Sequence, residues 1–320
     1  MSPLTRDRVV RAMWTLVEPL HSLNYFSDEA RAAFADVGLT RFWDGYFAGR
    51  AAPLGAVEAA PVVAIFSGFS PALTGRALPA AWSVASPSRV LEARAAGAEA
   101  ALRRIFGAPG VDIPAADVAR AAEVLVPVAE RAAGDTIGRP LAAANAALPV
   151  PPADEPYRRL WQATSTIREH RGDGHVVALV SEGIAGLSTI ILRSGLDLAP
   201  KTMKAARGWT DEQWAAEASA LVGRGLLDAD GRITPSGSAA VDRAEALTNR
   251  LALSPWKGLS DDDLLEVARV LRPLSAACGA IYPYPNPIGM PQPWDPDADP
   301  ALAGVPEVPG TRIPASSPSF

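Results

Sequence analysis

Apolar positions recur at helical spacing along most of the chain. Residues 5–23 carry the stripe Val9, Met13, Leu16, Val17 and Leu20, which is typical of an amphipathic helix. Capping signals agree with this pattern. Ser27 precedes a helix over 28–37, Ser86 and Pro87 open a helix that runs to Phe106, and Ser260 precedes the last one. The pattern predicts a mainly α fold.

Two glycines interrupt the helical pattern in the middle of the chain. The stripe over residues 157–171 stops at Gly172 and Gly174, and an apolar pattern resumes over 175–182. Glycine tolerates sharp backbone turns. We therefore expect a corner here between two helices.

Residues 201–251 have the order helix, helix, hairpin, helix. Thr210 and Gln213 form a capping box for the second helix. Short strands are expected at 226–227 and 232–234, around the turn Asp228–Gly231, before a helix over 239–251. This order predicts a winged helix with a small β-hairpin wing.

The chain divides at the proline-dense stretch "PVPPADEP", residues 149–156, which cannot continue a helix. Residues 1–148 would form an N-terminal winged-helix-like unit and residues 157–280 a C-terminal one, and 281–320 a proline-rich extended or disordered tail.

A faint repeat supports this division. Residues 41–68 align without gaps with 159–186. The coincident positions are Arg41/Arg159, Trp43/Trp161, Arg50/Arg168, Ala60/Ala178, Val62/Val180 and Gly68/Gly186. We expect two related units packed as a pseudo-dimer, with a ligand cleft between them.

Composition narrows the class of protein. The chain is 48% hydrophobic, with a formal net charge of −5 and a pI near 5.4, so no general affinity for nucleic acid is indicated. Cys278 is the single cysteine, which excludes an internal disulfide framework. The charged start "MSPLTRDRVV" is unlike a secretory signal, and no apolar run suits a membrane span. We expect a cytoplasmic protein without a membrane partner.

Several stretches resemble known regulators. "GWTDEQWAAEASALVGRGLLDADGRITPSG" (208–237) resembles the recognition helix and wing of MarR-type proteins. "RFWDGYFAGRAAPLG" (41–55), "AANAALP" (143–149) and "LWQATSTIREHRGDGHVVAL" (160–179) resemble an actinobacterial helix-turn-helix group, called SalK-like, that is often found near natural-product gene clusters. The resemblance implies the winged-helix fold and a setting in natural-product biosynthesis.

The expected recognition helix is poorly suited to DNA. Over residues 201–232, Lys201, Lys204, Arg207, Arg224 and Arg232 stand against Asp211, Glu212, Glu217, Asp228 and Asp230. Cations should predominate on a surface that faces phosphates. Nucleic acid is therefore a disfavoured partner, although Lys201 and Lys204 keep this alternative open.

The stretch "REHRGDGH" (168–175) carries the candidate chemistry. Glu169, His170, Asp173 and His175 are the candidate acid and base groups, since a carboxylate beside an imidazole suits proton transfer. Arg50, Arg168 and Arg171 are the candidate anion holders.

Two other interpretations of this stretch stay open. The same residues also suit a capped helix junction without chemistry, with Asp173 as the cap of the following helix. They also suit a metal site that combines the histidines, His21 included, with Asp173.

Aromatic residues offer a wall for a ligand. The candidates are Trp43, Tyr46, Phe47, Phe66 and Trp161, although such stripes are more often plain core. "SGFSP" (67–71) is not a nucleophile elbow. The chain has no nucleotide fingerprint, so we expect no cofactor.

These observations together predict a small-molecule-binding winged-helix protein, a monomer or homodimer. The favoured function is a tailoring enzyme of natural-product biosynthesis, a cyclase, isomerase or hydrolase that uses cofactor-independent acid–base chemistry on an aromatic or acidic substrate between the two units. The alternatives are a MarR-type ligand-responsive transcription regulator and a His/carboxylate metal-binding protein.

Overall fold

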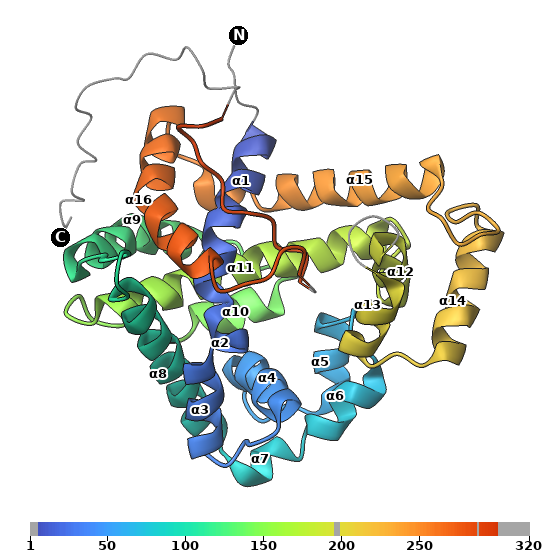
Figure 1. The fold of residues 1–320 in the computed structure, drawn as a ribbon, viewed down its shortest axis with the longest axis horizontal. Coiled ribbons are helices and arrows are strands. Elements are labelled where there is room, and N and C mark those ends of the chain that lie inside the picture. Colours follow the sequence, from blue (N-terminus) through green and yellow to red (C-terminus); the bar gives the residue numbers. More distant parts are fainter. Residues whose placement is uncertain (1–5, 195–198, 287, 300–320) are drawn as a thin grey trace.

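The computed structural model describes residues 6–194, 199–286 and 288–299. Within these ranges the regular structure is helical (Figure 1). The elements are α1 (Arg6–His21), α2 (Leu23–Phe26), α3 (Asp28–Asp36), α4 (Phe42–Ala51), η1 (Ala52–Leu54), α5 (Ala59–Ile65), α6 (Pro71–Ala77), α7 (Ala81–Val84), α8 (Pro87–Phe106), α9 (Ala115–Ala133), α10 (Pro140–Ala146), α11 (Pro156–Ser181), α12 (Leu187–Ser194), α13 (Pro200–Arg207), α14 (Asp211–Gly223), α15 (Pro235–Leu251), η2 (Ser254–Trp256) and α16 (Asp261–Gly279). The mainly α prediction is confirmed.

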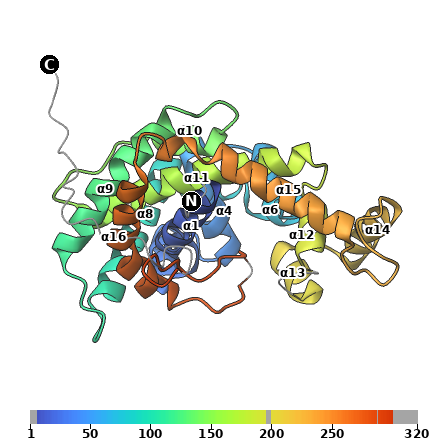
Figure 2. The ribbon, with the colours of Figure 1, turned by 90° about the horizontal axis from the view of Figure 1, so that it is seen from above.

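Helix α11 is the spine of the molecule. Its 26 residues extend over about 39 Å at 1.5 Å per residue. Its N-terminal part packs against α1, α8 and α9, and it also contacts α10 and α15. Seen from above, α15 runs beside α11 and connects the body to the helices at the far end (Figure 2). One rigid element therefore joins the core to the rest of the chain.

The expected corner at Gly172 and Gly174 is wrong, because α11 continues through both residues. The glycines serve close packing instead. A Cβ atom on Gly174 would lie 2.6 Å from Nη1 of Arg139 and 3.3 Å from Cβ of Leu251. Nη1 of Arg139 donates a hydrogen bond to the carbonyl of His170, at 2.6 Å. Gly174 thus lets a buried guanidinium lie against the helix.

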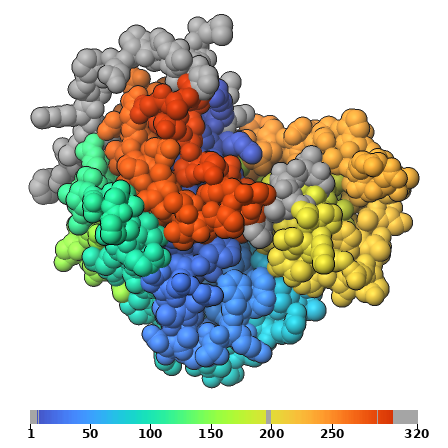
Figure 3. Space-filling model, in the orientation of Figure 1, coloured from blue at the N-terminus to red at the C-terminus, as the bar shows by residue number. Residues whose placement is uncertain are grey.

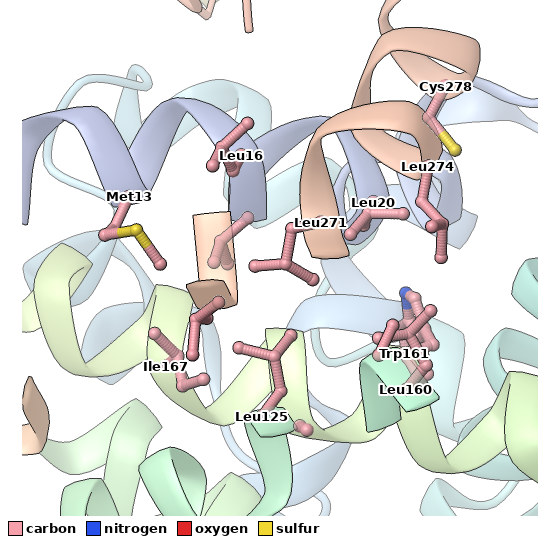
Figure 4. Close-up of a cluster of buried hydrophobic side chains, with 14 of the residues drawn as sticks. Met13, Leu16, Leu20, Leu125, Leu160, Trp161, Ile167, Leu271, Leu274 and Cys278 are labelled. Atoms are coloured by element: carbon pink, nitrogen blue, oxygen red, sulfur yellow. The ribbon is translucent and has the colours of Figure 1, made fainter. Parts of the chain in front are cut away.

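The largest core surrounds the first half of α11. Side chains from α1, α8, α9, α11 and α16 meet there, and Figure 4 shows Met13, Leu16 and Leu20 converging on Leu271 and Leu274. A second core is formed around α4, with Phe47, Phe66 and Phe69 among its residues. The first core draws residues from both expected units, whose separation stays a prediction.

The C-terminal helices α12, α13 and α14 form a separate lobe with its own apolar core (Figure 1). Thr210 and Gln213 make the predicted capping box at the start of α14. Gly208 ends α13 in the left-handed conformation, at φ 72°, and Leu73 packs so close that a Cβ there would lie 2.8 Å from it. Helices α13 and α14, joined by this tight turn, have the order of a helix-turn-helix.

The expected β-hairpin wing is not formed. Between α14 and α15, the described residues pair only through an isolated antiparallel bridge, Leu227 with Ile233. Thr234 caps α15 directly after the bridge, and the backbone N–H of Gly231 returns to the carbonyl of Asp228. The Asp228 carboxylate accepts the backbone N–H groups of Asp230 and Arg232, and Thr234 already caps α15, so the pairing ends after one bridge.

The C-terminal segment is extended, and its described part is packed on the body. Met290 is 2% exposed and Tyr282 is 9% exposed, and both belong to the first core. The backbone N–H of Trp294 donates to Thr15 at 2.8 Å. In Figure 3 the segment, in red, lies against the surface of the molecule. The disordered alternative is therefore wrong for residues 281–286 and 288–299, and residues 300–320 lie outside the described chain.

Candidate functional site

A cavity of about 250 Å³ lies between the helical body and the C-terminal lobe. It is walled by α1, α4, α11, α12, α13 and α15, by the loop after α5, and by Ile288 and Gly289 of the C-terminal segment. Its titratable lining residues are Glu18, Arg50, Arg168, Glu169, Arg171, Asp173, His175, Arg193, Arg207 and Glu245, and Ser67, Thr189 and Ser194 add hydroxyl groups.

Helix α11 supplies one whole wall of this cavity. Of the residues singled out in "REHRGDGH", Arg168, Glu169, Arg171, Asp173 and His175 all line it. They can do so because the helix continues: residues three and four apart lie on one face. The sequence predicted that these residues would converge at a corner between two helices. They are instead brought together on one continuous helix.

Glu169 is the centre of a buried ion network. Arg168 donates to it at 2.8 Å, and Nη2 of Arg50 lies 3.3 Å from its Oε1. Arg168 also bonds Glu18 at 3.2 Å. Burial alone would raise the pKa of Glu169, but the charges of Arg168 and Arg50 overcome it and hold the pKa at about 2. Glu169 therefore stays ionised and fixes both arginines.

Two arginines in the lining present donors that meet no acceptor. Arg50 is 8% exposed and Arg171 is 9% exposed, and neither Nε of Arg50 nor Nη1 of Arg171 has a hydrogen-bond partner. Arg50 bonds Tyr46 through Nη1 at 3.2 Å, and Arg171 bonds Glu245 through Nη2 at 2.5 Å. A buried donor left unpaired costs about 1–3 kcal/mol, so both guanidinium groups have hydrogen-bonding capacity that the protein itself does not use.

The carboxylate of Asp173, a residue of α11, contacts the start of α10. Its Oδ2 accepts the backbone N–H of Ala142 at 2.9 Å, so it caps a helix from outside, though not the following helix that the sequence suggested. Burial raises the pKa of Asp173 to about 7, against the effect of the Ala142 bond, and the nearby Glu169 carboxylate adds to the rise. Asp173 can thus exchange a proton near neutral pH.

His175 faces the cavity and is anchored from α15. Its Nδ1 lies 2.9 Å from the hydroxyl of Thr248. Burial lowers the pKa of His175 to about 4, and the charge of Arg171 lowers it further against the effect of Glu245. The imidazole is neutral at neutral pH.

His170 is separated from the other candidates. Its Nε2 lies 3.1 Å from Asp135 and 3.4 Å from the hydroxyl of Ser254, and it does not line the main cavity. Burial lowers the pKa of His170 to about 4, with a further contribution from Arg139. The expectation that His170 shares a site with His175 is wrong, because they project from α11 towards different neighbours.

The histidines do not assemble as metal ligands. His21 bonds Ser165 at 3.1 Å and Tyr25 at 2.5 Å, far from the partners of His170 and His175. Among the described residues, no three His, Cys, Asp or Glu side chains lie where they could hold one ion.

The aromatic candidates divide between core and cavity. Phe66 lines the cavity, with the Arg50 guanidinium 3.8 Å above its ring. Trp43, Tyr46 and Phe47 pack on one another and on Phe69 in the second core. Trp161 is 1% exposed and donates to the carbonyl of His21 at 3.2 Å. Only Phe66 of the five can therefore meet a ligand in this cavity.

Several lining residues went unrecognised in the sequence. Trp14 and Glu18 come from α1, Arg193 from α12, and Arg207 from α13. Glu245 lines the cavity too, and Thr248 lies behind it. Thr248 lies with Ala244 on the buried face of α15, and Glu245 is beside that face. Polar residues at such positions in the sequence could have indicated that α15 contributes to the site.

The exposed face of α14 carries few groups that suit DNA. The helix begins with exposed Asp211 and Glu212 and contains no lysine or arginine. Lys204 forms an ion pair with Asp211, and Arg232 one with Asp230. Lys204 and Arg232 thus already face carboxylates of the same lobe, whereas no carboxylate pairs with the exposed Lys201 or Arg224 among the described residues.

The arrangement of α13 and α14 defines a helix-turn-helix protein with a ligand-sized cavity beneath the motif. Comparison with known families agrees: a model described as a helix-turn-helix family matches residues 10–284. The chain belongs to this helix-turn-helix family. No curated protein and no solved structure matches it.

Among the described helices, none has the length and apolar character needed to span a bilayer.

Proposed function

We propose that the protein binds a small organic anion in the cavity between its body and its C-terminal lobe. The observation that carries this proposal is the predominance of arginine in the lining of one cavity: Arg50, Arg168, Arg171, Arg193 and Arg207 outnumber the carboxyl residues Glu18, Glu169, Asp173 and Glu245. A carboxylate or phenolate would accept from the arginines, and hydrogen bonds to a charged group are the strong ones.

The size and apolar lining of the cavity indicate the body of the ligand. An apolar cavity of about 150 Å³ holds benzene in a well-studied lysozyme variant, so about 250 Å³ suits one ring with substituents. The apolar lining includes Phe66, Phe69, Leu141, Ile190 and Met203. An aromatic acid matches both the positive charge of the arginines and the apolar residues of the lining.

Turnover of the ligand would use proton transfer without a cofactor. Asp173 is the group in the lining whose pKa, raised by burial to about 7, suits exchange near neutral pH. We propose natural-product biosynthesis as the setting of such a reaction, on the resemblance of residues 41–55, 143–149 and 160–179 to the SalK-like group. In Asp173→Asn, ligand should still bind while turnover is lost.

Titration calorimetry on the full chain tests the proposed binding. We expect benzoate to bind the wild type, and Arg50→Met and Arg171→Met each to weaken binding by about tenfold or more, because each removes a charge-assisted bond worth about 1.5–3 kcal/mol. Arg120→Met is the matched control, since Arg120 pairs with Glu266 on the surface. Equal affinity in all four proteins, or no binding to any, would reject the proposal.

A ligand-responsive regulator is the second candidate. Helices α12 and α13 line the cavity and also belong to the lobe that carries the helix-turn-helix, so a ligand would contact the motif directly. A gel shift against the upstream DNA separates the candidates. Affinity that falls steeply with salt and is lost in the double variant Lys201→Ala/Lys204→Ala supports the regulator.

A further inference from the structure

The hydrogen bonds of Thr248 determine which nitrogen of His175 carries the proton. The Thr248 hydroxyl donates to the carbonyl of Ala244, one turn back on α15, at 2.7 Å. Its single proton is then used. The contact of 2.9 Å with His175 must therefore run the other way, with Nδ1–H donating to the hydroxyl oxygen. A neutral imidazole has one N–H, so Nε2 is left with a lone pair.

This lone pair is an unused acceptor in the cavity wall. No described residue hydrogen-bonds Nε2 of His175, whereas Nδ1 is held by a Thr248 that is itself fully buried. The pKa of the imidazole, which burial lowers to about 4, keeps it neutral and able to accept at neutral pH. The wall thus offers donors from arginines and one acceptor from a histidine.

We propose that the ligand carries a hydroxyl group as well as its anionic group, and that Nε2 of His175 accepts the hydroxyl proton. The ligand class is then a hydroxylated aromatic carboxylic acid, and Thr248 is a positioning residue that fixes the tautomer of His175. This inference rests on the proposed anion binding and adds a specificity to it.

The spacing along α11 supports one ligand that spans both groups. Arg171 and His175 are four residues apart and both line the cavity, and such residues have Cβ atoms about 5–6 Å apart on one helix face. A site that pairs with a ligand hydroxyl discriminates against the analogue that lacks this group. An acid without the hydroxyl would leave Nε2 of the half-buried His175 without a partner from the ligand.

The tautomer is tested without any ligand. Long-range proton–nitrogen spectra of the full chain with labelled histidine should show the His175 proton on Nδ1. Thr248→Ser keeps the hydroxyl and should keep this pattern, while Thr248→Val keeps the shape and should lose it. A proton on Nε2 in the wild type would overturn the inference.

Calorimetry with benzoate and the three hydroxybenzoate isomers tests the ligand class. We expect at least one isomer to bind about tenfold more tightly than benzoate, the ratio expected from one good hydrogen bond. The preference should persist in Thr248→Ser and disappear in Thr248→Val and His175→Phe, and the readout is the ratio of hydroxybenzoate affinity to benzoate affinity within each variant.

The outcomes separate this inference from the proposed function. If benzoate binds with the arginine dependence given above but no isomer binds more tightly, the hydroxyl specificity is wrong and anion binding stands. A preference that survives both Thr248→Val and His175→Phe also overturns the role of His175. If none of the four acids binds the wild type, both proposals fail.

Discussion

The carboxyl group of Asp173 has two roles: it accepts a hydrogen bond that caps a helix, and it titrates near neutral pH. Its Oδ2 caps α10 through Ala142, yet burial raises its pKa from 3.8 to about 7. Between these two values the folded protein holds a proton that the unfolded chain has released. Stability should therefore fall as the pH rises from about 4 to 7 through this group.

Asp173→Asn isolates the cost of this ionisation. The amide oxygen can still accept from Ala142, and it carries no charge at any pH. We expect the variant to be more stable than the wild type by about 1–3 kcal/mol above pH 7, with the difference vanishing near pH 4. Urea unfolding across this range measures it. Asp173→Ala, which loses the acceptor, should be less stable than Asp173→Asn at every pH, and equal pH profiles of the wild type and Asp173→Asn would contradict the assignment.

The candidate residues show what a sequence can and cannot reveal about a site. Arg50, Arg168 and Arg171 were expected in one site, and all three line the cavity; that they hold an anion stays a prediction. That His170 lies away from His175 was not predictable, because it depends on Asp135 after α9 and on Ser254 in η2, which are distant in the sequence.

Helix α11 depends on its glycines for packing. In Gly174→Ala the new methyl group would press on Nη1 of Arg139, 2.6 Å away, and strain its bonds to the carbonyls of His170 and Leu251. We expect a loss of about 1–3 kcal/mol, despite the better helix propensity of alanine.

Gly75→Ala is the control for this change. Gly75 lies inside α6 with open space around it, so alanine should stabilise the protein by up to about 1 kcal/mol. Thermal unfolding of both variants is the measurement. A Gly174→Ala protein as stable as Gly75→Ala would show that the guanidinium moves aside without cost.

Element boundaries could be predicted where a local signal decides them. The caps at Ser27, Ser86, Thr210 and Ser260 each accept the backbone N–H three residues on. The predicted break in α11 was wrong because Gly174 is needed for close packing against Arg139 and not for a turn. Arg139 is distant in the sequence, so the local pattern could not show this contact. The predicted wing was wrong because the turn at Asp228 and the cap at Thr234 take up the residues on either side of a single bridge.

The stability of the whole molecule should depend on its neutral histidines. Burial lowers the pKa of His170 and His175 from 6.5 to about 4, and that of His21 well below its usual value. The unfolded chain takes up protons on these groups first. The contribution of these three histidines to the free energy of unfolding is therefore fully present above pH 6.5 and is lost as the pH falls towards 4.

The pH dependence of the free energy of unfolding gives the number of protons that the chain takes up when it unfolds. Three histidines favour proton uptake on unfolding and Asp173 opposes it, so about two protons should be taken up near pH 5. Denaturant unfolding between about pH 5 and 7 gives the slope, and His170→Gln should lower it by about one proton. A flat profile would show that the imidazoles titrate normally in the folded state.

The continuous α11 also has an evolutionary consequence. One wall of the cavity belongs to the same straight helix that organises the main core, so changes there would disturb folding. The opposite wall, made by α12, α13 and the loop over 66–69, lies largely outside that core. Relatives that diverge in the chemical they recognise should therefore vary mainly across this second wall, while the arginines of the spine stay fixed.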